Sequence, residues 1–259
     1  MPKYTPELQQ EYDDLFSSCV IRQDKMAEVE TFVNKIAQNK ARYEEIEQQS
    51  GVPWYFIAAI HCLEASLKFD AHLHNGDPLT ARTVHVPKGR PPGNPPFTWK
   101  ESALDALSFE GFDSWTDWSM PGGLYKLEGY NGFGYRPKNV NSPYLWSYSN
   151  HYTSGKYVKD GEWDPNAVSK QCGAAVLLRR MADRGIIAVD AAPQPTVTVS
   201  DLQPVPYAPT VISDEAKQLQ KKLNTFPGIL LVEDGRAGKN TSDAFKKLTG
   251  NYLPGDPRA

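Results

Sequence analysis

The hydrophobic positions of this chain recur at helical spacing over several segments. In residues 24–49, apolar positions such as Val29, Val33 and Ile36 alternate with Lys and Glu, a pattern typical of an amphipathic helix with one solvated face. Residues 52–67 are apolar on nearly every side, which predicts a helix in the centre of a domain. From periodicity and capping residues, we also predict helices over residues 5–18, 99–109, 119–130 and 164–184.

The helical pattern stops between residues 70 and 96. A turn sequence, NGDP at 75–78, precedes a short β-prone stretch at 80–86, and a Pro- and Gly-rich segment follows it. This arrangement predicts a small β-hairpin or loop lobe. A second turn, rich in Gly and aromatic residues, is predicted at 130–135.

The pattern also divides the chain into two modules. Residues 190–210 are rich in Pro and poor in charge, which predicts an extended, semi-rigid linker. Residues 211–259 contain two short amphipathic segments around a DGRAGKNT turn. The fold class is therefore predicted to be mainly α (α+β), with a helical domain at 1–189 that carries a small hairpin lobe and a small C-terminal module.

Composition narrows the class of function. The net charge of −3 gives no basic surface of the kind that nucleic-acid-binding proteins carry, and no apolar run is long enough to span a membrane. The three cysteines, Cys19, Cys62 and Cys172, lack metal-type spacing and fit a reducing compartment. The N-terminus shows no secretory signal. We expect a monomer without a cofactor.

Glu64 is the most unusual candidate residue. It lies near the end of the apolar stretch AAIHCLEASLKF at 58–69, where burial of a carboxylate is costly unless the group is paired or neutral. Pairing with His61 or Lys68, each within one helical turn, would be a structural explanation. Alternatively, desolvation and the helix dipole raise its pKa and keep a proton on it.

The segment SGVPWYFIAAIHCLEASLKFDAH resembles the catalytic helix of the lysozyme superfamily, particularly goose-type lysozymes and lytic transglycosylases. Those helices end in a Glu-x-Ser motif, matched here by Glu64 and Ser66. The order of this acid, then Asp77, then Thr80 and Thr83 is similar to that of phage-type lysozymes. The Tyr-Asn-Gly turn at 130–132 is similar to one that lines the transglycosylase cleft. The resemblance covers residues 50–185.

The C-terminal segment resembles the small three-helix peptidoglycan-binding module. The sequence LQKKLN at 219–224 matches a helix of that module. Asp234, Gly235, Gly238 and Thr241 match its Asp-Gly-x-x-Gly-x-x-Thr loop. The closing sequence LTGNYLPGDPRA departs from the usual last helix of that module. The resemblance implies that this module binds cell wall.

Together the two resemblances imply a glycosidase that cleaves β-1,4 linkages of peptidoglycan. Glu64 would be the general acid, and Asp77 would be the ionised second carboxylate, with Asp70 as its rival. Thr83 or Thr80 would orient the water. We expect inversion of the anomeric carbon. Lytic transglycosylation, cleavage of chitin or chitosan, and non-catalytic wall binding remain alternatives.

Aromatic and polar residues around these positions are candidates for contact with the sugar polymer, because sugar rings stack on aromatic side chains. The candidates for substrate binding are Thr80, His74, Arg82, Tyr130, Asn131, Tyr135, Trp146, Tyr148 and His151. His72, His74 and His85 also cluster in sequence, but they lack the spacing of a zinc site. No metal is therefore expected. The substrate implies action at the cell wall, in an extracellular or periplasmic location reached by a separate delivery route or after removal of a signal.

Overall fold

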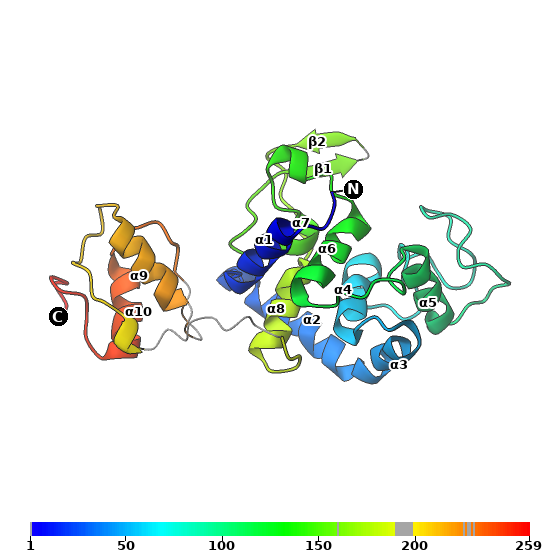
Figure 1. Cartoon of the computed structure of the whole chain (residues 1–259), viewed down its shortest axis with the longest axis horizontal. Coiled ribbons are helices and arrows are strands. Elements are labelled where there is room, and N and C mark those ends of the chain that lie inside the picture. Colours follow the sequence, from blue (N-terminus) through cyan, green and yellow to red (C-terminus); the bar gives the residue numbers. More distant parts are fainter. Residues whose placement is uncertain (1, 160, 190–198, 225, 227–228, 230) are drawn as a thin grey trace. The chain divides into compact units, whose positions relative to one another are not determined.

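The computed structural model describes residues 2–159, 161–189, 199–224, 226, 229 and 231–259. The chain forms two compact units, Met1–Asp190 and Ala191–Ala259, and Figure 1 shows the elements of each. The described residues are mainly helical, with a two-stranded antiparallel sheet, so the predicted fold class is confirmed. None of the helices in this described part has the length and hydrophobicity that a membrane span needs.

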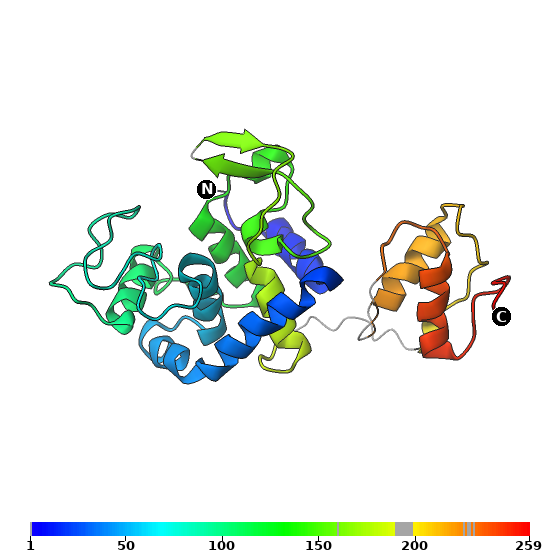
Figure 2. The ribbon, with the colours of Figure 1, turned by 180° about the vertical axis from the view of Figure 1, so that it is seen from behind.

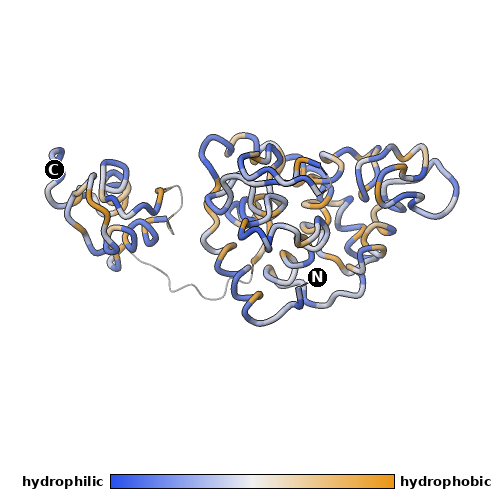
Figure 3. Tube along the Cα trace, turned by 90° about the horizontal axis from the view of Figure 1, so that it is seen from above, coloured by the Kyte–Doolittle hydropathy of each residue, from blue (hydrophilic) through white to orange (hydrophobic). Residues whose placement is uncertain are grey.

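The first unit is a cluster of helices with one hairpin. Its elements are α1 (Pro6–Ser17), η1 (Gln23–Lys25), α2 (Met26–Gln38), α3 (Lys40–Ser50), α4 (Trp54–Ala65), α5 (Trp99–Phe109), α6 (Met120–Asn131), η2 (Arg136–Lys138), α7 (Pro143–Trp146), β1 (Lys156–Lys159), β2 (Glu162–Asp164) and α8 (Ala174–Asp183). Hydrophobic stretches alternate with hydrophilic ones along the trace (Figure 3), as amphipathic helices require.

Helix α4 is the central helix of this unit, as its apolar sequence predicts. It contacts α3, α6 and α8, and Figure 2 shows it enclosed among other helices from the opposite side. Nearly all of its side chains are buried. The helix ends abruptly because Ser66 and Leu67 both adopt left-handed backbone conformations, with φ of 51° and 60°. This sharp end leaves Glu64 in the last turn of a buried helix.

Two sequence predictions about the helices were wrong. The helix predicted at 24–49 is two helices, because the backbone leaves the helical conformation at Asn39. The helix predicted from Asp164 begins only at Ala174. The carboxylate of Asp164 does bond the backbone N–H of Asn166 and Ala167, but it caps a turn after β2 rather than a helix.

Of the two alternatives predicted for residues 70–96, a small hairpin or a loop lobe, the structure has the loop. The β-prone stretch at 80–86 forms no strand, and residues 70–96 contain only an isolated bridge between Ala71 and Pro78. Backbone N–H groups that a hairpin would use, those of Val84 and His85, instead donate to the carboxylate of Asp77. The hairpin of the unit is β1–β2, at residues 156–164.

The second unit begins earlier than its predicted start at residue 211. Leu202 belongs to its hydrophobic core, and Ala208 forms a β-bridge with Ala237. Part of the predicted linker, 199–210, is therefore part of this unit, while 190–198 lie outside the described residues. The resemblance implies three helices. The described part of this unit has two α-helices, α9 (Asp214–Asn224) and α10 (Lys239–Thr249), and one short 3₁₀ helix, η3 (Val199–Asp201).

The loop that suggested a wall-binding module holds this unit together. Gln220 accepts a hydrogen bond from the Gly235 N–H at 2.8 Å and donates to Asp234 and Thr241. Gly235 has a φ of +74°, and a Cβ there would lie 2.9 Å from the Ser213 carbonyl oxygen. Only glycine fits at this position.

Candidate active site

Glu64 lies in the last turn of α4 and is partly exposed. Burial raises the pKa of its carboxyl to about 7, while a hydrogen bond from Tyr144 lowers it and the charge of Glu110 raises it. The structural alternative, a pair of Glu64 with His61 or with Lys68, is not formed; the hydrogen-bond partner of this carboxyl is Tyr144. His61 bonds the Tyr43 hydroxyl and the Lys68 carbonyl, and burial lowers its pKa to about 4. Glu64 is therefore a carboxyl that is partly protonated at neutral pH.

Two tyrosines stand beside this carboxyl. The Tyr144 hydroxyl, from α7, donates to Glu64 Oε1 at 2.8 Å. The ring of Tyr130, in the last turn of α6, stacks on the Tyr144 ring with centroids 6.4 Å apart and planes 16° apart. The Tyr130 hydroxyl in turn donates to the Leu73 carbonyl at 3.2 Å. This pair fixes the position of Glu64 and connects α6 to the loop after α4.

The backbone around Glu64 is held from two sides. Gly76 packs so closely that a Cβ there would lie 2.7 Å from the Glu64 carbonyl oxygen, which brings the segment containing Asp77 against the end of α4. On another side, Gln171 Nε2 donates to the Leu63 carbonyl at 2.5 Å. Gln171 and Ser66 also line a pocket of about 400 Å³. This pocket lies beside the end of α4, but Glu64 is not among its lining residues.

Asp77 is ionised, as the sequence suggests, but its oxygens are already engaged. Oδ2 accepts the backbone N–H of Val84 at 2.8 Å and of His85 at 3.0 Å, and Oδ1 lies 2.6 Å from His85 Nδ1. Burial alone would raise the pKa of Asp77, but the hydrogen bonds from His85 and Val84 outweigh it and lower the pKa to about 2. In this structure Asp77 organises the loop.

The other loop candidates have similar structural roles. The buried Thr83 hydroxyl donates to the Pro87 carbonyl and accepts the Arg90 N–H at 2.9 Å. Its single proton is therefore used within the loop rather than for orienting water. Arg82 Nε donates to the Gly93 carbonyl at 2.9 Å, and Thr80 is exposed.

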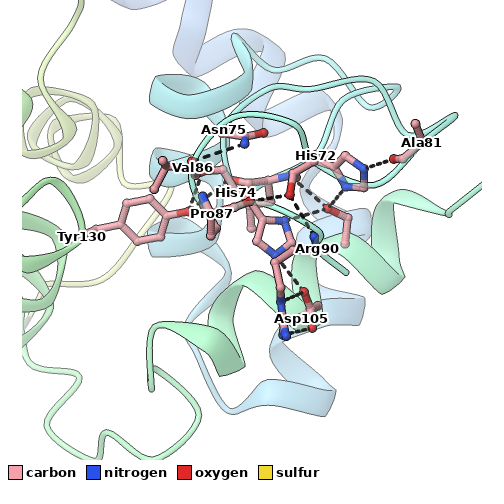
Figure 4. A network of polar contacts seen from close by, with 12 residues as sticks. His72, His74, Asn75, Ala81, Val86, Pro87, Arg90, Asp105 and Tyr130 are labelled. Carbon is pink, nitrogen blue, oxygen red and sulfur yellow. Dashed lines mark hydrogen bonds and ion pairs between the residues drawn. The ribbon is translucent and has the colours of Figure 1, made fainter. Parts of the chain in front are cut away.

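His72 and His74 form a buried network against α5 (Figure 4), whereas His85 is exposed and lies against Asp77. His72 Nδ1 lies 2.8 Å from Ser102 Oγ, and His74 Nε2 lies 2.8 Å from Asp105 Oδ2. Arg90 also pairs with Asp105. His74 is thus committed to a structural ion-pair network and is not free to bind sugar. Within the described ranges, no group of three or more His, Cys, Asp or Glu is placed to hold a metal ion.

The remaining aromatic candidates are not gathered around Glu64. Trp146 is only 1% exposed, so it cannot present a face to a polymer at that site. Tyr148 is buried and donates to Glu28, while Tyr135 packs edge-on against Tyr157. His151 lies 3.2 Å from Ser18 Oγ. Of the predicted contact residues, Tyr130 is the one that these contacts place beside Glu64, and Asn131 follows it, exposed, at the end of α6.

Sequence reasoning missed Tyr144, Gln171 and Glu110. Tyr144 is 80 positions from Glu64, and no periodicity connects two positions so far apart. Glu110 follows the last residue of α5. Burial raises its pKa, and it is a second carboxyl whose charge reaches Glu64. The sequence feature that comes nearest to identifying Tyr144 is its position in an aromatic segment directly after Pro143.

Replacing Tyr144 with Phe is expected to raise the pKa of Glu64 further above about 7, because the hydrogen bond from Tyr144 lowers that pKa. Titration of the Glu64 side chain by ¹³C NMR measures this directly. Tyr43→Phe is the matched control, since Tyr43 is a buried tyrosine bonded to His61 instead. An unchanged or lower pKa in Tyr144→Phe would contradict the assigned contact.

No protein-family model, curated protein or solved structure matches this chain. What the protein does must therefore be inferred from the chemistry of the site.

Proposed function

We propose that this protein is a glycosidase of the lysozyme type, which cleaves β-1,4 linkages of an amino-sugar polymer with Glu64 as the general acid. The observation that carries the proposal is a partly exposed carboxyl at the end of a buried helix, with a pKa of about 7. A proton donor works best when its pKa is near the working pH. Glycoside cleavage needs such an acid to protonate the leaving oxygen.

Peptidoglycan is the substrate we favour, because the Glu64–Ser66 helix and the C-terminal loop both resemble proteins that act on it. In this proposal the enzyme works at the cell wall as a monomer, and the second unit holds it there. Chitin and chitosan contain the same β-1,4 amino-sugar linkage and are the alternative substrates. The alternative to an enzyme is a protein that binds the cell wall without cleaving it.

The state of Asp77 favours a second candidate reaction. In hydrolysis with inversion, a carboxylate must activate water, yet both oxygens of Asp77 accept hydrogen bonds from the loop. Glu110 is the other carboxyl that acts on Glu64. Intramolecular transglycosylation requires no second carboxylate. Glu64 gives its proton to the leaving oxygen as the glycosidic C–O bond breaks, and the ionised Glu64 then takes the proton of the sugar hydroxyl that forms the new C–O bond. Lytic transglycosylation is therefore the second candidate reaction, after hydrolysis.

Digestion of purified peptidoglycan, followed by mass spectrometry of the soluble fragments, tests these proposals together. Fragments with reducing ends indicate hydrolysis, whereas anhydro fragments, lighter by one water, indicate transglycosylation. Chitin and chitosan digested in parallel define the polymer. Absence of soluble fragments from all three polymers, under conditions where the protein binds walls, would contradict a glycosidase and support a binding protein.

A further inference from the structure

Ser102, on α5, lies between the rings of two histidines from the loop after α4 (Figure 4). The ring centroids of His72 and His74 are 5.8 Å apart. Ser102 Oγ lies 2.8 Å from His72 Nδ1 and 3.4 Å from His74 Nδ1, and it accepts the backbone N–H of Leu73 at 3.2 Å. All three side chains of this histidine cluster, His72, Ser102 and His74, are buried, so their polar atoms depend on one another for hydrogen bonds.

The outer nitrogen of each ring has to carry a hydrogen. His72 Nε2 lies 2.8 Å from the carbonyl oxygen of Ala81, which can only accept. His74 Nε2 lies 2.8 Å from Asp105 Oδ2, and the ion pair of Asp105 with Arg90 keeps this carboxylate an acceptor as well. If both rings are neutral, each inner nitrogen, Nδ1, is therefore an acceptor without a hydrogen of its own.

One proton is missing from the centre of the cluster. The single hydrogen of the Ser102 hydroxyl satisfies only one Nδ1, that of His72 at 2.8 Å rather than that of His74 at 3.4 Å. One added proton on either Nδ1 completes the network, because Ser102 Oγ then accepts this N–H and the Leu73 N–H while donating to the other ring. With a second added proton both Nδ1 atoms would be donors, and the serine hydrogen would have no acceptor. The contacts thus accommodate one proton.

The groups that face His74 decide where on the pH scale this proton is taken up. Burial lowers the pKa of His74 from its ordinary 6.5, and the charges of His72 and Arg90 lower it too, while Asp105 raises it. The Tyr130 hydroxyl, from α6, donates to the His74 carbonyl at 3.4 Å and stays neutral, since burial raises its pKa. The cluster therefore lacks the added proton at neutral pH and takes it up in mildly acidic conditions.

We propose that the histidine cluster is a binding site for one proton, and that occupancy of this site regulates the position of Tyr130. The Leu73 N–H donates to Ser102, and the Leu73 carbonyl accepts the Tyr130 hydroxyl at 3.2 Å, so one peptide segment connects the cluster to α6. Proton uptake adds the missing hydrogen bond and fastens this segment to α5. Tyr130 stacks on Tyr144, which bonds Glu64. Control of cleavage by this proton rests on the proposed function, whereas the proton site itself does not.

NMR of the full chain with ¹⁵N-labelled histidine, as the pH falls from about 8 to about 5, tests the proton site. The Nδ1 signals of His72 and His74 are expected to move together in a single step, because Ser102 connects the two atoms. Ser102→Ala should separate the two responses and weaken proton binding about ten- to a hundredfold, the loss of one hydrogen bond to a charged group. Ser108→Ala, an exposed serine of α5, is the matched control and should leave the step unchanged.

Unrelated steps for the two histidines in the natural chain, or uptake of two protons in this pH range, would overturn the proton site. This measurement needs no variant, so it decides the matter even where Ser102→Ala does not fold.

Glu64→Gln separates the regulation from the proposed function, because it removes the titration of Glu64 itself. In this variant the step at the cluster should remain, and the ring signals of Tyr130 should shift in the same step. Addition of Ser102→Ala should abolish that shift. Tyr130 signals that do not follow the step would overturn the regulation while leaving the glycosidase, which is judged by the loss of cleavage in Glu64→Gln. A Tyr130 response in a chain that cleaves no polymer would retain the proton site and remove the glycosidase.

Discussion

Replacement of Glu64 by Gln is expected to reduce the rate of peptidoglycan cleavage by about 10²–10⁴-fold, the usual contribution of a general acid. The amide keeps the size of the side chain and can still accept a hydrogen bond from Tyr144, which contacts Oε1 at 2.8 Å. It has no carboxylic proton to give to the leaving oxygen. Release of soluble fragments from purified cell walls measures the loss, and sedimentation with the same walls measures binding, which should be retained.

Glu47→Gln is the matched control for this experiment. Glu47 lies on α3, is also partly buried, and has a pKa raised by burial, but it makes no contact with the Tyr130–Tyr144 pair. Its replacement should leave the cleavage rate unchanged. Equal rates in Glu64→Gln and the natural chain would show that the acid is elsewhere, and Glu110 would be the next carboxyl to test.

The sequence was informative about Glu64 because the signal there is local. An acid in an apolar helix is visible in a dozen residues, and the structure confirms both the helix and the raised pKa. The helices predicted at 5–18, 99–109 and 119–130 correspond to α1, α5 and α6 for the same reason. Their periodicity and their caps, such as Thr98 before α5, lie within the segment itself.

The rest of the site depends on side-chain contacts between distant segments, which no local pattern reveals. The stretch at 80–86 has strand-like composition, but the Asp77 carboxylate takes two of its N–H groups and so competes with strand pairing. Trp146 and Tyr148 could from their sequence be either core residues or walls of a sugar-binding cleft, and both are buried. Composition identifies aromatic residues without indicating which of them face solvent.

The raised pKa of Glu64 has a consequence for stability that is independent of any substrate. The pKa of this carboxyl is about 7 in the folded chain, against an ordinary value of 4.5. Between these two values the folded state keeps a proton that the unfolded state has lost, so folding stability falls as the pH rises through this window. With 1.36 kcal/mol per pKa unit, the loss is about 3 kcal/mol once the pH exceeds 7.

Glu64→Gln removes this titration and is therefore expected to change the pH dependence of stability. Relative to the natural chain, the variant should gain about 3 kcal/mol in free energy of unfolding when the pH rises from 4 to 8. Urea denaturation followed by tryptophan fluorescence reports on the relevant unit, since all six tryptophans lie between residues 54 and 163. Glu47→Gln should give a smaller gain, because burial raises the pKa of Glu47 without a shift as large as that of Glu64.

Parallel curves of unfolding free energy against pH for the natural chain and Glu64→Gln would mean that Glu64 titrates normally. A normal carboxyl would be almost fully ionised at neutral pH and would be a poor proton donor. The stability difference and the catalytic role thus depend on the same desolvation of Glu64.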